Sequence, residues 1–159
     1  MKASIEILKN LDLFSLLDEE ELGKINSISE EVDYRKGETI VKEGIHSESL
    51  FIIKNGCVRV TKDSRLIVIL GEGSLIGELS FIDKGLPSAT VTAEQDSRLI
   101  RIPLSIFDNL LSENKGMEGK LYKSFALTLC QKLRDTNEWL STEKWLAEVE
   151  KQALSRFHI

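Results

Sequence analysis

The middle of the chain consists of short runs of β-branched and apolar residues that glycines interrupt. Between residues 31 and 103 apolar residues recur with a period of two, and glycines separate the runs at positions 37, 44, 56, 71, 73 and 85. Six runs have the composition of strands: residues 38–42, 50–53, 57–61, 66–70, 90–93 and 98–102. Many short strands with glycine turns are typical of a mainly β sandwich, barrel or jelly roll. The clearest turn, at residues 62–65, predicts a hairpin.

Helical spacing flanks this region on both sides. Before it, apolar residues recur at helical spacing, which turn-forming Asn10 and Asp12 interrupt: Ile5, Leu8, Leu11, Leu16, Leu17, Leu22 and Ile25. Ser15 or Asp18 can cap a helix there, and a long helix is expected from about Lys120. Residues 76–82 are too helical for a strand although they lie between strands. We therefore expect one domain in three parts: N-terminal helices over 1–30, a β-roll over 31–103, and C-terminal helices over 104–159.

A seam of small and apolar residues runs along the predicted long helix. It alternates steps of three and four, through Ala126, Leu129, Leu133, Thr136 and Leu140. This spacing is typical of paired helices, so the sequence favours a homodimer. The alternative is that the seam packs on the β-roll of its own chain.

Charge and hydropathy exclude several classes of protein. The net charge is −5 and the pI is about 5.2, which argues against a nucleic-acid-binding chain. The longest apolar runs, 50–53 and 66–70, are far too short to cross a bilayer, and no signal peptide is apparent. We expect a cytoplasmic protein with no membrane or nucleic-acid partner. Cys57 and Cys130 match no metal-ligand spacing and are expected to be reduced packing residues.

The sequence contains no arrangement typical of catalysis. It has no nucleophile with a base, no paired carboxylates and no metal-ligand cluster, and its two histidines, His46 and His158, lie in polar or terminal positions. We expect a protein that is not an enzyme and needs no metal or cofactor.

Residues 73–91 form the segment best suited to hold a ligand. Glycines flank the predicted helical turn, whose free N–H groups can receive an anion, and residues 85–91 add a loop of small residues. Gly77 lets the backbone approach a ligand, and Glu78 can accept hydrogen bonds from a sugar hydroxyl. In the alternative interpretation Gly77 only turns the chain and Glu78 only caps a helix.

Five segments in order resemble the cyclic-nucleotide-binding domain family, which includes the bacterial catabolite activator protein and the regulatory subunits of cAMP-dependent protein kinase. These are residues 35–38, 41–44, 51–60, 77–79 and 88–91, and the resemblance extends over about 11–140. It implies an eight-stranded jelly roll (a double-stranded β-helix) with N-terminal helices, a phosphate-binding cassette over 73–91 and a long C-terminal helix.

The resemblance also implies a ligand, cAMP or cGMP, and the residues that bind it. Glu78, after Gly77, would bind the ribose hydroxyl. Backbone N–H groups of Leu79 and Ser80 would hold the phosphate, which Ser88 and Ala89 would contact from the other side. The next strand opens with Thr90 and Val91, of which Val91 would line the pocket. The adenine contacts would be Thr136 and Asn137, one of them from the partner subunit. As an alternative, these two are a polar step in the helix seam.

One position departs from the family pattern. Cyclic-nucleotide-binding members place an arginine immediately before the residue matching Ser88, where it pairs with the phosphate, and this chain has Pro87. Lys84 is the nearest cation in sequence that can substitute. The hypotheses are therefore a cyclic-nucleotide sensor that signals through its C-terminal helix to a separate downstream protein, and a degenerate dimeric scaffold without a ligand. A transcription factor fits poorly, because residues 141–159 are too few for a helix-turn-helix domain.

Overall fold

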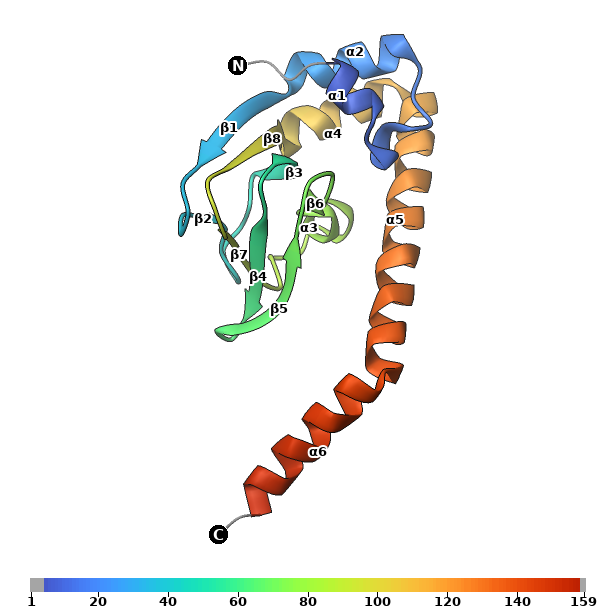
Figure 1. The fold of residues 1–159 in the computed structure, drawn as a ribbon. Coiled ribbons are helices and arrows are strands. Elements are labelled where there is room, and N and C mark those ends of the chain that lie inside the picture. The colour runs from blue at the N-terminus through green and yellow to red at the C-terminus, as the bar shows by residue number, and fades with distance from the viewer. Residues whose placement is uncertain (1–4, 158–159) are drawn as a thin grey trace.

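Two antiparallel sheets form the body of the protein (Figure 1). The computed structural model describes residues 5–157, without the side chains of residues 143–145 and 155–157. Within these residues the sheets have the strand orders β1-β8-β3-β6 and β2-β7-β4-β5. The strands are β1 (Glu30–Tyr34), β2 (Thr39–Val41), β3 (Ser49–Asn55), β4 (Val58–Lys62), β5 (Arg65–Leu70), β6 (Leu75–Ile76), β7 (Thr90–Ala93) and β8 (Ser97–Pro103). The predicted eight-stranded jelly roll is confirmed.

Helices precede, interrupt and follow the strands. They are α1 (Ile5–Lys9), the 3-10 helix η1 (Asp12–Phe14), α2 (Glu19–Ile28), α3 (Glu78–Asp83), α4 (Leu104–Glu113), α5 (Lys115–Ser141) and α6 (Glu143–Phe157). Asp18 is the N-cap of α2 and forms a capping box with Glu21. The long helix α5 begins at Lys115 rather than near Lys120. Gly116 and Gly119 lower the helix propensity of its first turns, which explains why the sequence pattern placed its start too late.

The six predicted runs all coincide with strands, but two further strands escaped the pattern. Strand β1 is mostly charged, and its acidic residues pair with arginines of β8. Arg98 binds Asp33 through two hydrogen bonds of 2.6 and 3.1 Å, and Arg101 binds Glu30. The Arg98 guanidinium also lowers the pKa of Asp33 below its ordinary value. Such cross-strand ion pairs support a strand that lacks a hydrophobic alternation. Strand β6 is only two residues long.

The hairpin at residues 62–65 is confirmed. Lys62 pairs with Arg65 across the turn, and the two residues between them, Asp63 and Ser64, both have left-handed φ values of 48° and 63°. Positive φ at both central positions matches the right-handed twist of the flanking strands, and Asp and Ser tolerate it because of their short polar side chains.

Strand β3 is buried on both faces and joins two hydrophobic clusters. Phe51 and Ile53 face the interior of the roll with Val41, Val58, Ile76, Val91 and Leu99. Leu50 and Ile52 face the helices, with a cluster that includes Phe14, Leu22, Ile25, Phe81, Phe107 and Phe125. Burial on both faces explains why this strand is a continuous apolar run rather than an alternating one.

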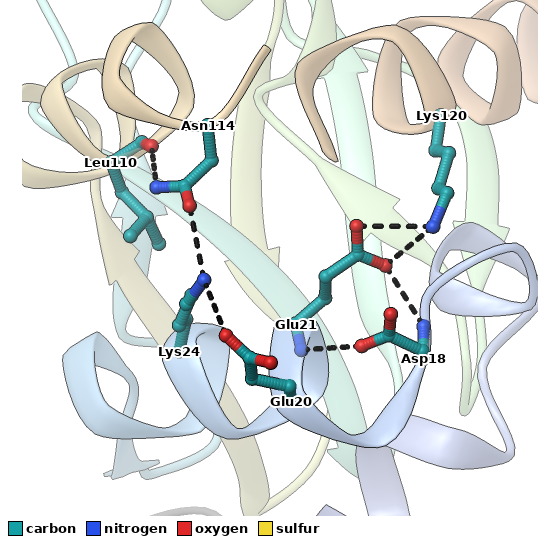
Figure 2. A network of polar contacts seen from close by, with 7 residues as sticks. All are labelled: Asp18, Glu20, Glu21, Lys24, Leu110, Asn114 and Lys120. Carbon is teal, nitrogen blue, oxygen red and sulfur yellow. Dashed lines mark hydrogen bonds and ion pairs between the residues drawn. The ribbon is translucent and has the colours of Figure 1, made fainter. Parts of the chain in front are cut away.

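Helix α5 is anchored at its first turns, where its buried residues lie, and then runs beside α3 and the roll (Figure 1). Figure 2 shows the anchor: Lys120 donates to both carboxylate oxygens of Glu21 at 3.0 and 2.8 Å, and Lys24 donates to Asn114 at 3.0 Å. These contacts tie α2 to the α4–α5 junction. Among residues 5–157, no helix has both the length and the apolar character required to cross a membrane.

Candidate functional site

A sharp turn at Gly77 joins β6 to α3. Gly77 has a φ of 94°, and a Cβ at this position would lie only 3.2 Å from the carbonyl oxygen of Ser49. Both the positive φ and the close approach require glycine here. The helical expectation for residues 76–82 is confirmed from Glu78 onward by α3. Ile76 instead belongs to β6, which pairs with β3.

A pocket of about 140 Å³ lies between this turn, the β-roll and α5. Its apolar wall comes from the strands and consists of Val41, Val60, Leu70, Leu75, Ile76 and Val91. The other lining residues are Ser47, Gly77, Glu78, Leu79, Ser80, Pro87, Ser88, Ala89 and Lys132. The fold thus brings residues 77–80 and 88–89, which are separate in sequence, to one cavity.

Seven of the ten predicted ligand-binding residues line this pocket, namely Gly77, Glu78, Leu79, Ser80, Ser88, Ala89 and Val91. Thr90 lies at its edge, where its hydroxyl accepts a hydrogen bond of 3.1 Å from the backbone N–H of Glu43. Thr136 and Asn137 do not line the pocket. They lie exposed on the second half of α5, and the Thr136 hydroxyl donates to the carbonyl of Lys132 at 2.8 Å.

Glu78 is a buried carboxylate whose partner comes from α5. Its side chain is 7% exposed, and Lys132 donates a hydrogen bond to its Oε1. The same ammonium lies 3.5 Å from the carbonyl oxygen of Leu75. A buried carboxylate needs such a partner, because an unpaired charge in a desolvated site is strongly destabilising.

Lys132 is the site residue that sequence reasoning missed. It lies between Leu129 and Leu133 of the predicted seam, four residues before Thr136 and therefore on the same face of the helix. A lysine within an apolar seam was the available signal. The identity of its partner was not available, because Glu78 lies 54 positions earlier.

The loop before β7, which contains Pro87 and Ser88, is held by residues that do not line the pocket. Lys62 of β4 donates to the carbonyl of Ser88 at 2.9 Å and to Glu43 at 2.6 Å, and the Gly44 N–H donates to the Pro87 carbonyl at 2.9 Å. The hydrogen bond from Lys62 lowers the pKa of Glu43 below its ordinary value and raises that of Lys62. These contacts place Ser88 and Ala89 opposite the α3 turn.

Lys84 does not take the place of the missing arginine. It has a left-handed φ of 59° at the end of α3, and its ammonium binds Asp108 of α4 at 2.8 Å and lies 4.7 Å from the centre of the Phe81 ring. Of the described residues that line the pocket, Lys132 is the only cation and Glu78 the only anion. Within residues 5–157, no three His, Cys, Asp or Glu side chains come together as a metal site.

Residues 31–114 match the family model of the cyclic nucleotide-binding domain. This chain belongs to the cyclic-nucleotide-binding domain family. The matched residues contain both sheets except Glu30, together with α3 and α4, and therefore the pocket apart from Lys132.

Comparison with individual proteins supports this membership. A cGMP-dependent protein kinase of Drosophila melanogaster is 34% identical over 95 residues, which cover 56% of this chain and 10% of the kinase. A catabolite activator protein from Thermus thermophilus is 26% identical, with a TM-score of 0.68 over 81% of this chain and 61% of that one. A putative cyclic nucleotide-binding protein from Geobacter metallireducens shares the fold, with a TM-score of 0.76 at 24% identity, over 82% and 98% of the two chains. This chain thus spans about a tenth of the length of the curated kinase that it matches.

Proposed function

We propose that this protein is a non-catalytic regulatory domain that binds a cyclic nucleotide, cAMP or cGMP, and transmits the binding through α5. The observation that carries the proposal is the pocket itself, which joins the α3 turn, the 88–89 loop and a residue of α5 around a buried carboxylate. A separate protein would then respond to the position of α5.

Each part of the pocket suits one part of a cyclic nucleotide. The Glu78 carboxylate is an acceptor for a ribose hydroxyl, and Lys132 occupies only its Oε1. The backbone at Leu79 and Ser80, with Ser88 and Ala89 opposite, suits the phosphate. The apolar side chains of Val60, Leu70 and Val91 can pack against the sugar and the base.

The second half of α5 supports a homodimer as the working form. Leu133 and Leu140 are 62% and 41% exposed, and Ala126 is also exposed, so these seam residues do not pack on the β-roll of their own chain. Leucines at coiled-coil spacing favour burial against an equivalent helix. In a dimer, the exposed Thr136 and Asn137 would lie between the two helices, where the family pattern has its contacts with the base.

A second candidate is a dimeric scaffold that binds no nucleotide. Pro87 favours it, because Pro87 lines the pocket where cyclic-nucleotide-binding members supply an arginine. The missing charge-assisted hydrogen bond is worth about 1.5–3 kcal/mol, which corresponds to roughly ten- to a hundredfold in affinity.

Titration calorimetry with cAMP and cGMP separates the two candidates. The wild type is expected to bind one of them, and Pro87→Arg is expected to bind it about tenfold or more tightly. Proline's fixed φ offsets about 0.4–1 kcal/mol of the gain, because the arginine loop is less ordered when free. If a folded Pro87→Arg protein gives neither heat nor a thermal shift at millimolar nucleotide, the scaffold is the correct function.

A further inference from the structure

Three lysines surround the ligand-binding loop, and their partners differ. Lys62 is bound to Glu43 and to the Ser88 carbonyl, and Lys84 is bound to Asp108. Neither lines the pocket. Only Lys132, which comes from α5 and not from the roll, presents its ammonium to the cavity. The cation nearest to the site is therefore on the helix that also carries the dimer seam.

The ammonium of Lys132 retains capacity for a ligand. An ammonium has three N–H donors. One is used by Glu78 Oε1, and the Leu75 carbonyl at 3.5 Å is at best a long second partner. At least one donor is left for an anion in the cavity. The Glu78 carboxylate likewise keeps Oε2 for a hydroxyl of the ligand, since Lys132 is its only hydrogen-bond partner among the described residues.

Among the described residues, Lys132 also makes the only polar contacts between the second half of α5 and the β-roll with α3. Among the hydrogen bonds and ion pairs of the described residues, no other joins residues 126–141 to the strands or to α3. Whatever strengthens or weakens this contact therefore changes how firmly the second half of α5 is held.

From these observations we infer that Lys132 supplies the positive charge that binds the anionic group of the ligand, in place of a cation from the loop where Pro87 stands. The inference rests on the proposed function and specifies the ligand as a sugar with both a free hydroxyl and a phosphate. The hydroxyl binds Glu78, and Lys132 bridges Glu78 and the phosphate. Because the charge is on α5, the phosphate attaches the helix to the pocket, and a neutral nucleoside does not.

The test compares cAMP with adenosine, which lacks the phosphate, in the wild type and three variants. Lys132→Met is expected to weaken cAMP binding about ten- to a hundredfold while changing adenosine binding little. Lys132→Arg, which keeps the charge, is expected to bind cAMP nearly as well as the wild type. Lys84→Met is the matched control and is expected to leave both affinities unchanged, because Lys84 is bound to Asp108 outside the pocket.

Two further variants separate a direct role of the charge from the effect of leaving Glu78 unpaired. Pro87→Arg added to Lys132→Met is expected to restore cAMP binding by at least tenfold, because it returns a cation to the site from the loop. Glu78→Gln added to Lys132→Met removes the unpaired charge, and the preference for cAMP over adenosine is expected to stay low. A preference that recovers in this second variant would mean that Lys132 only neutralises Glu78.

Amide hydrogen exchange over residues 126–141 supplies a readout beyond affinity. In the wild type, cAMP is expected to slow exchange there and adenosine is not, and Lys132→Met is expected to abolish the difference. A wild type that binds cAMP while Lys132→Met binds it equally well would overturn the inference and leave the proposed function intact. If neither the wild type nor Pro87→Arg binds a cyclic nucleotide, both proposals are wrong.

Discussion

The two halves of α5 belong to one continuous helix but are held in different ways. In the first half, Met117, Leu121, Ser124 and Phe125 are buried, and Lys120 is bound to Glu21. From residue 126 to 141 every side chain is exposed or half-buried, and the contacts of Lys132 with Glu78 and the Leu75 carbonyl are the only polar contacts to the roll that the structure describes. The first half is part of the hydrophobic core. The second half has few buried contacts, and such elements open at the lowest free energy.

The largest expected effect is on folding stability and is confined to the first half. Phe125 is fully buried and packs against Phe81, whose ring centre is 5.4 Å away. Phe125→Ala is expected to lower the free energy of unfolding by about 3–5 kcal/mol, because it removes a large side chain and leaves a cavity. Urea denaturation measures the change. Leu127→Ala, on an exposed leucine of the same helix, is the control and is expected to change stability by less than about 0.5 kcal/mol.

The next largest expected effect is on the affinity for the ligand, and it concerns Glu78, the partner of Lys132 in the second half of α5. Glu78→Ala is expected to weaken cyclic-nucleotide binding by about 1.5–3 kcal/mol, because the charged acceptor for the ribose hydroxyl is lost. Glu21→Ala removes a carboxylate that binds Lys120 of α5 outside the pocket and is expected to leave affinity unchanged. Titration calorimetry measures the nucleotide affinity of both folded variants. Equal affinities for Glu78→Ala and the wild type would mean that the sugar does not lie at Glu78.

A substitution in the predicted dimer seam should change the oligomeric state while changing the stability of the single chain little. Leu133→Asp is expected to convert a dimer into a single chain at micromolar concentration, because it places a charge in the apolar seam. The free energy of unfolding of the single chain should change by less than about 0.5 kcal/mol, since Leu133 is 62% exposed. Sedimentation measures the oligomeric state. A wild type that already sediments as one chain contradicts the dimer.

The smallest expected effect is the pH response of the ion pair between Lys62 and Glu43, which holds the loop before β7. Lys62 lowers the pKa of Glu43, so the pair stabilises the folded protein fully above the ordinary glutamate pKa. This contribution is lost as the pH falls from that value through the lower folded pKa. The Glu43 carboxyl resonance, followed by NMR, should therefore titrate below the ordinary value, and in Lys62→Met its pKa should rise toward that value. An unchanged titration in Lys62→Met would show that the loop is held without this pair.

Much of the roll was predictable because its determinants are local. The period of two marked six strands, and the polar pair Asp63 and Ser64 marked the hairpin. Asp18 marked the start of α2, and Gly77 marked the turn at the pocket. Each of these signals needs only a few neighbouring residues, whose backbone preferences and alternation are the same in any context.

The remaining features depend on contacts between distant segments. Strand β1 exists because its acidic side chains meet Arg98 and Arg101 across the sheet, which no local pattern of residues 30–34 indicates. The partner of Glu78 is decided by the path of α5, which brings Lys132 to a carboxylate 54 positions away. The same path leaves Leu133 and Leu140 exposed, although their spacing alone fits a seam on the roll as well as a seam between chains. Helical spacing specifies that one face is apolar, but only the packing of the whole chain decides what covers that face.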